Sequence, residues 1–150
     1  MINFDKVYKS YPGNMDALQN INLEILPAEL VFVTGPSGAG KSTLLKLISS
    51  VERPTSGTIV FENMNLSQLK SNDIPYLRRK FGMIFQDHKL LYDRNCFENV
   101  SLPLAINDIG GVNINRRVRA ALDKVGLLNK EKIMPISLSG GEQQRLAIAR

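Results

Sequence analysis

The segment Gly35–Thr43, GPSGAGKST, constrains the fold of this chain more than any other. It fits the pattern G-x-x-x-x-G-K-[ST], which places a glycine-rich loop between a strand and a helix. The apolar run Leu30–Thr34 lies directly before it and, having almost no alternation, predicts a strand covered on both faces. After Lys41 the apolar residues fall on one side of a helix, at Leu44, Leu45, Leu47 and Ile48. This order of elements predicts an α/β fold built around the loop.

The residue types in the loop are those that a nucleoside triphosphate needs. Glycines allow consecutive backbone N–H groups to turn inward around phosphate oxygens, and the helix adds its positive N-terminal end. Lys41 is expected to reach the β- and γ-phosphates, and the Ser42 hydroxyl to complete the ligand shell of a Mg²⁺ ion. The predicted nucleotide-binding residues are Gly35, Pro36, Ser37, Gly38, Ala39, Gly40, Lys41, Ser42 and Thr43.

Hydrophobic patterning predicts the other elements. Residues 1–8, 21–25 and 58–61 alternate or are short and apolar, which is typical of strands. Helices are predicted near Cys96–Ile106 and Asn115–Val125, and Gly126 is expected to close the second of them.

A phosphate-binding loop by itself leaves kinases, GTPases and transport ATPases open. Two segments superficially resemble guanine-reading elements of GTPases, namely Asp123–Gly126 and Asn129–Lys132. Lys132 stands where the guanine-reading aspartate would be, and the two segments are too close together in the sequence. We therefore interpret them as a helix end and a polar loop.

A second anion-binding pattern lies at Leu138–Glu142, LSGGE, directly before an amphipathic helix. Ser139 provides a hydroxyl and an N-cap, while Gly140 and Gly141 expose N–H groups at the helix start. The segment resembles the signature motif of the ABC-type ATPases, whose common form is LSGGQ, with Glu142 in place of the glutamine. Its position downstream of a phosphate-binding loop agrees with the order of motifs in that family.

The resemblance to ABC-type ATPases implies roles for further residues. Tyr11 corresponds to the aromatic residue that stacks on adenine, and Gln86 to the glutamine that contacts the metal and hinges the helical subdomain. The implied cofactors are ATP and Mg²⁺, with Ser42 and Gln86 as metal-binding residues. The implied catalytic residues are Lys41, Gln86 and Ser139.

The same resemblance implies an architecture and an assembly. The fold would be a P-loop ABC-type nucleotide-binding domain, with a parallel α/β core, an antiparallel β subdomain and a helical subdomain. Within residues 1–150, the β-rich part with the loop would span 1–86, and the helical part with the signature would span 87–150. Two copies would form a head-to-tail homodimer, in which ATP held by one copy is closed over by Ser139 and Gly141 of the other.

Several elements of the family's domain are expected beyond Arg150. These are the Walker B strand with its metal-binding aspartate, the catalytic glutamate and the switch histidine. His88, the only histidine, precedes the signature and is expected to have a surface or structural role. We therefore expect a C-terminally truncated chain without turnover of its own. Its buried strands, predicted at Leu30–Thr34 and Gly82–Phe85, would lack neighbours and leave apolar faces unpaired.

Within the family, Gly82–Arg94 is most similar to members that serve cell division, which implies an integral membrane partner. The start of the chain lacks the features of a signal peptide, and no apolar stretch approaches the ~18–20 residues that span a bilayer. Cys96 is the single cysteine, which fits a reducing compartment. We expect a cytoplasmic protein, bound peripherally to the inner face of the membrane through its partner.

Three alternatives stay open. An ATPase subunit of a related lipoprotein or drug exporter would share every motif described above, and so would a nucleotide-dependent regulatory module that does not hydrolyse ATP. Only the charge distribution suggests nucleic-acid binding, because the net charge of +5 lies entirely in residues 116–150. No aromatic residues interleave with these basic residues, so we interpret them as a solvated helix face and expect no nucleic-acid partner.

Overall fold

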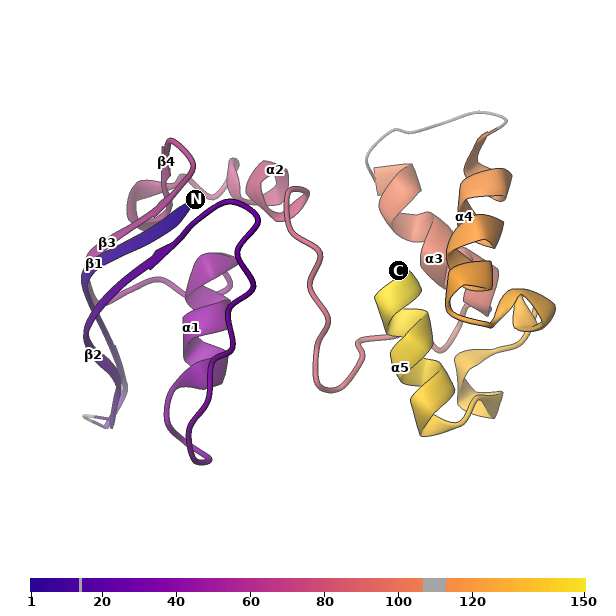
Figure 1. Ribbon diagram of the computed structural model, residues 1–150, viewed down its shortest axis with the longest axis horizontal. Helices are drawn as coiled ribbons and strands as arrows, with labels where there is room; N and C mark the ends of the chain where they lie inside the picture. Colours follow the sequence, from indigo (N-terminus) through magenta and orange to yellow (C-terminus); the bar gives the residue numbers. More distant parts are fainter. Residues whose placement is uncertain (14, 107–112) are drawn as a thin grey trace. The chain divides into compact units, whose positions relative to one another are not determined.

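The computed structural model describes residues 1–13, 15–106 and 113–150. The chain divides into two compact units, Met1–Phe81 and Gly82–Arg150, and each is described by itself (Figure 1). The first unit contains a β-sheet and the phosphate-binding loop. The second is helical and contains the signature motif.

The sheet of the first unit is antiparallel throughout and has the strand order β2-β1-β3-β4. Its strands are β1 (Ile2–Tyr11), β2 (Met15–Ile25), β3 (Ser56–Phe61) and β4 (Met64–Asn65). Phe4 of β1 pairs with Leu23 of β2 and with Ile59 of β3, so apolar residues from three strands lie on one face. This sheet is the antiparallel β subdomain that the resemblance to ABC-type ATPases implied.

Helix α1 (Lys41–Ile48) packs on this sheet and completes the core of the first unit (Figure 1). Leu44 and Leu47, on the apolar side of α1, are both buried. The remaining buried apolar residues come from the sheet and from the segment after it, and they are Phe4, Val7, Leu18, Ile59, Leu66 and Leu77. Because the apolar side of α1 is buried against the sheet, the loop that directly precedes α1 is held close to the sheet.

The segment after β4 consists of the 3₁₀ helix η1 (Leu66–Gln68) and the short helix α2 (Ile74–Arg78). Arg78 ties α2 to the end of α1, because its guanidinium donates to the carbonyl oxygens of Ser49 and Ser50 at 3.3 and 3.0 Å. These bonds hold the C-terminal end of α1 against α2.

The prediction of buried strands at Leu30–Thr34 and Gly82–Phe85 is wrong for this structure. Neither segment belongs to a strand, and Leu30, Phe32 and Ile84 have exposed fractions of 79%, 80% and 57%. A parallel strand exists only through hydrogen bonds to its neighbours, and the four strands of residues 1–13 and 15–106 pair only with one another. Within the described residues, no strand pairs with either of these two apolar segments.

The second unit packs three α-helices around one core: α3 (Cys96–Ile106), α4 (Asn113–Lys124) and α5 (Gly140–Ala149). The 3₁₀ helices η2 (Leu128–Lys130) and η3 (Pro135–Ser137) connect α4 to α5. The buried apolar residues are Leu90, Cys96, Val100, Val118, Leu122, Leu127, Leu138, Leu146 and Ala147. Both predicted helices are therefore present, and α4 begins two residues before the predicted start.

Helix α4 ends in a Schellman motif, as Gly126 predicted. Gly126 has a φ of 71°, and its N–H donates to Asp123 O at 2.9 Å while Leu127 N donates to Leu122 O at 2.8 Å. The buried Leu127 then leads directly into η2. Of the helices in the described residues, none has the length and apolar character that crossing a bilayer requires.

Candidate functional site

The phosphate-binding loop has the backbone conformation that its glycines permit. Gly35, Gly38 and Gly40 have φ values of 145°, 83° and 84°, all in the region that side chains disfavour. At Gly40 an added Cβ would overlap the carbonyl oxygen of Ala17 in β2 and lie 2.8 Å from Leu18 Cδ2. Gly40 is therefore required for the close packing of the loop on the sheet.

The N-terminus of α1 is open to a ligand. Its N-cap is Gly40, so no side chain bonds the free N–H groups of the first helical turn. The Lys41 ammonium folds back over the loop and donates to the carbonyl oxygens of Gly35 and Pro36, both at 2.7 Å. A helix N-terminus with free N–H groups and an adjacent cation is a favourable place for phosphate oxygens.

Tyr11, at the end of β1, lies beside the first turn of α1. Its hydroxyl is 3.5 Å from Thr43 Oγ1, and Lys9 Nζ lies 4.9 Å from the centre of its ring. Thr43 is buried, whereas the neighbouring Ser42 is exposed. The structure thus brings the predicted adenine-stacking residue to the loop, although 32 residues separate Tyr11 from Thr43. Sequence reasoning missed Lys9, for which the pattern gave no signal.

The signature motif forms the N-terminal cap of α5. Ser139 is the N-cap, and its hydroxyl accepts a hydrogen bond from Glu142 N at 3.4 Å. Glu142 Oε2 in turn accepts from Ser139 N at 3.0 Å and from Ser139 Oγ at 3.1 Å. This reciprocal capping box satisfies two backbone N–H groups at the start of the helix.

A lysine outside the motif completes this arrangement. Lys130 Nζ, at the end of η2, lies 2.6 Å from Glu142 Oε1. The ammonium, followed by the N–H and hydroxyl of Ser139, lowers the pKa of Glu142 from 4.5 to about 2. Glu142 is therefore ionised at any ordinary pH. Sequence reasoning missed Lys130, because only the fold brings this residue to the motif.

The two glycines of the motif are not required by local packing. A Cβ added to Gly140 would meet nothing within 4 Å, and one added to Gly141 would meet only the Arg145 guanidinium, at 3.8 Å. Neither residue has a positive φ. Glycine weakens a helix, and the packing of this unit gives no reason for it at either position.

Gln86 is exposed and lies in the second unit. The side chains of Arg150 and Asn99 hold the segment that follows it. Arg150 donates to the carbonyl oxygens of Lys89 and His88, at 2.6 and 3.5 Å. The fully buried Asn99 accepts from Leu91 N at 2.9 Å and donates to the carbonyl oxygens of Leu91, Arg94 and Asn95. Sequence reasoning identified Gln86 but not Asn99, which fixes the turn that leads into α3.

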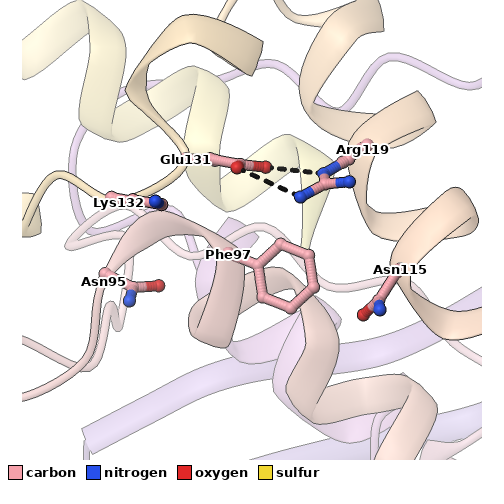
Figure 2. A pocket seen from close by; sticks show the side chains of 6 residues that line it. All are labelled: Asn95, Phe97, Asn115, Arg119, Glu131 and Lys132. Atoms are coloured by element: carbon pink, nitrogen blue, oxygen red, sulfur yellow. Dashed lines mark hydrogen bonds and ion pairs between the residues drawn. The ribbon is translucent and has the colours of Figure 1, made fainter.

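A shallow hollow opens on the helical unit between the start of α3, α4 and the segment after η2 (Figure 2). Arg119 crosses it to bind Glu131 through two bonds, Nε to Oε2 at 2.9 Å and Nη2 to Oε1 at 3.3 Å. This pair lowers the pKa of Glu131 and raises that of Arg119. The other lining residues are Asn95, Phe97, Asn115 and Lys132.

The structure thus places the predicted site residues in two groups. Tyr11 and the residues of Gly35–Thr43 lie together in the first unit, and Gln86 and the signature residues lie in the second. Each group has one helix N-terminus suited to an anion, formed by α1 in the first and α5 in the second.

Comparisons with known proteins identify the family of the chain. The family model described as "ABC transporter" matches residues 18–150. The chain is 56% identical to the "Cell division ATP-binding protein FtsE" of Escherichia coli K12 over 150 residues, which cover all of this chain and 68% of that protein. It is 47% identical to the protein of the same name from Bacillus subtilis, over all of this chain and 66% of that protein.

Solved structures show the same fold. A dimeric structure of the ATP-binding cassette MJ0796 in a post-hydrolysis state, bound to ADP and Pi, superimposes with a TM-score of 0.92. Its sequence is 35% identical, and the match covers 99% of this chain and 68% of that one. As its two anion-binding motifs predicted, the chain belongs to the ABC transporter family and has the fold of its ATP-binding domain.

Proposed function

We propose that this chain belongs to the ATP-binding subunit of a membrane complex of the FtsE–FtsX type, in which the full-length protein binds and hydrolyses ATP to drive its membrane partner. The observation that carries the ATP-binding part is the N-terminus of α1, which has free N–H groups, a glycine N-cap and the Lys41 ammonium beside it. The assignment to the cell-division type is supported by 56% identity, over all of this chain, to a relative named FtsE.

The roles of the first group follow from its geometry. The backbone N–H groups of Gly35–Thr43 would surround the β-phosphate, and Lys41 would exchange its two carbonyl partners for phosphate oxygens. The Tyr11 ring, which already has a cation over it, would stack on adenine. Charged phosphate oxygens are stronger partners for an ammonium than peptide carbonyls, so the exchange is favourable.

The loop also fits a Mg²⁺ ion. The ion takes oxygen ligands, and the exposed Ser42 hydroxyl in the first turn of α1 would be one of them, together with phosphate oxygens. When bound, Mg²⁺ supplies neutralisation of the charge that develops on the transferred phosphoryl group. The chain's own contribution there is Lys41, which holds the same phosphates from the protein side.

The second group would act on ATP held by another copy of the chain. The helix N-terminus of α5 carries Ser139 and two exposed glycines, and no local packing explains the glycines. A head-to-tail homodimer explains them, because a triphosphate held by the partner's loop would approach the α5 backbone closely. The solved relative with TM-score 0.92 is itself a dimer bound to ADP and Pi.

In this assembly, closure of the dimer would hold the γ-phosphate between Lys41 of one copy and the Ser139 hydroxyl of the other, and it would exclude bulk water. The nucleotide state would be passed to an FtsX-like integral membrane protein. The chain would thereby lie on the membrane surface through its partner.

The test is co-purification of the protein with candidate membrane subunits, with and without a non-hydrolysable ATP analogue. Capture of an FtsX-type subunit in preference to the membrane subunit of a methionine importer is expected. The second subunit is the fair competitor, because the chain is 45% identical to the "Methionine import ATP-binding protein MetN" of Histophilus somni over 99% of its length, which is 43% of that protein. Preference for the importer subunit would overturn the FtsE–FtsX assignment.

A further inference from the structure

The Glu142 carboxylate is held by three donors at the start of α5. Oε1 receives the Lys130 ammonium at 2.6 Å, and Oε2 receives the N–H and the hydroxyl of Ser139 at 3.0 and 3.1 Å. Only 18% of the Glu142 side chain is exposed, compared with 38% for Lys130. The Ser139 hydroxyl is therefore turned toward Glu142.

A carboxylate in this place creates an electrostatic problem. The N-terminus of α5 favours anions, and Glu142 already occupies part of this favourable field. A triphosphate approaching the same turn would meet a like charge, which disfavours binding unless a cation offsets it. Lys130 is the cation in direct contact with Glu142.

Lys130 stands on a fixed part of the backbone. Its N–H donates to Leu127 O at 2.9 Å, and its carbonyl oxygen accepts from Ile133 N at 3.0 Å. Leu127 is fully buried and belongs to the Schellman motif at the end of α4. The position of the Lys130 backbone is thus set by the core of the helical unit rather than by α5.

We propose that Lys130 is a positioning residue for the signature motif, which turns the Glu142 carboxylate toward η2 and offsets its charge so that the start of α5 can receive the γ-phosphate of ATP. The inference rests on the proposed function, because it assumes that ATP approaches this helix. It assigns to Lys130 an indirect role, exerted through Glu142 and the Ser139 hydroxyl.

An ordinary surface ion pair would have little effect on association. The geometry here differs, since Glu142 has three charge-assisted bonds and one of them comes from the hydroxyl that would contact ATP. The low pKa of Glu142, about 2, agrees with strong coupling to Lys130. When Lys130 is removed, the carboxylate keeps only its bonds from Ser139, and its charge is no longer offset beside the incoming triphosphate.

The test is a double-mutant cycle of Lys130→Met and Glu142→Gln, read as association of the protein in a non-hydrolysable ATP analogue. Lys130→Met is expected to weaken association about tenfold in the unaltered background and less than about twofold in the Glu142→Gln background, where no charge needs to be offset. Lys130→Arg should restore most of the loss. Lys132→Met, a matched loss of charge at an exposed lysine two residues away, serves as the control.

Two further measurements separate this inference from a structural role and from the proposed function. The pKa of the Glu142 carboxyl, followed by NMR, should rise in Lys130→Met, while ATP binding to single copies should stay unchanged. Equal loss of association in both backgrounds, or no loss in either, would overturn the role of Lys130. Failure of the unaltered protein to associate with the analogue would instead overturn the proposed dimer.

Discussion

The N-termini of α1 and α5 both present backbone N–H groups, but those of α1 have no side-chain cap and those of α5 have one. At α1 the N-cap is Gly40, and the first turn carries no capping side chain. At α5 the N-cap is Ser139, and its capping box with Glu142 already satisfies backbone N–H groups. An anion can enter the first site directly, whereas at the second it must compete with the chain's own side chains. This difference suits a site that binds ATP by itself and a second site that closes only on ATP already bound.

The glycines at the two sites differ in whether local packing requires them. Gly40 is demanded by the fold, because any Cβ there would overlap the backbone of β2. Gly141 has ordinary helical space around it, so the fold of the second unit does not require glycine there, whereas the proposed approach of ATP from another copy would. Mutations at these positions should therefore separate effects on folding from effects on association.

Gly40→Ala should have the largest effect on stability. The left-handed backbone and the overlap with Ala17 together are expected to lower the free energy of unfolding of the first unit by about 4 kcal/mol. Denaturant unfolding measures this loss. Gly38→Ala is the matched control, since it has the same kind of φ but an open environment, and a loss of only about 1 kcal/mol is expected there. Equal losses would show that packing on β2 does not matter.

Lys41→Ala should reduce ATP affinity about 100-fold, because it removes the cation beside the α1 N-terminus. Titration with a fluorescent ATP analogue gives the dissociation constant. Lys46→Ala, in the last turn of the same helix, is the control and should leave the affinity unchanged. An unchanged affinity in Lys41→Ala would contradict the assignment of the phosphates to this loop.

Gly141→Ala should raise the stability of the second unit, whereas Gly40→Ala lowers that of the first. Alanine is a better helix former, and the added Cβ makes only an ordinary contact, so the second unit should gain about 0.5 kcal/mol. Association driven by an ATP analogue should nevertheless weaken, because the Cβ occupies the approach to the helix backbone. Thermal unfolding and analytical ultracentrifugation measure the two effects. A variant that associates normally would remove the argument for action between copies.

The smallest expected effect is on the pH dependence of stability, which Glu142 at the start of α5 should produce and which has no counterpart at the start of α1. The pKa of Glu142 is lowered from 4.5 to about 2, so its contribution to folding is fully present above pH 4.5 and is lost as the pH falls toward 2. Unfolding of the unaltered protein and of Glu142→Gln, compared from pH 7 to pH 2, should therefore give curves that converge only below pH 4.5. A difference that stayed constant over this range would contradict the coupling.

The candidate site was predictable where the chemistry is local in sequence. The spacing of Gly35, Gly40 and Lys41 and the string of Leu138–Glu142 each place backbone N–H groups at a helix start, whatever the rest of the fold does. Lys9 and Lys130 were not predictable, because their contacts with Tyr11 and Glu142 depend on how distant segments pack. The sequence shows a glutamate at position 142 but not which basic residue the fold brings to it.

By itself the sequence determined the family, through its two motifs, and most of the strands and helices, because turns, caps and periodic apolar faces are encoded within short segments. The antiparallel arrangement of the sheet was implied by the resemblance to the family. Only the tertiary structure decided that Leu30–Thr34 and Gly82–Phe85 are not strands, since a strand exists through its neighbours and an apolar run cannot create them. It also decided that Lys130 meets Glu142, because the core around Leu127 fixes where η2 lies against α5.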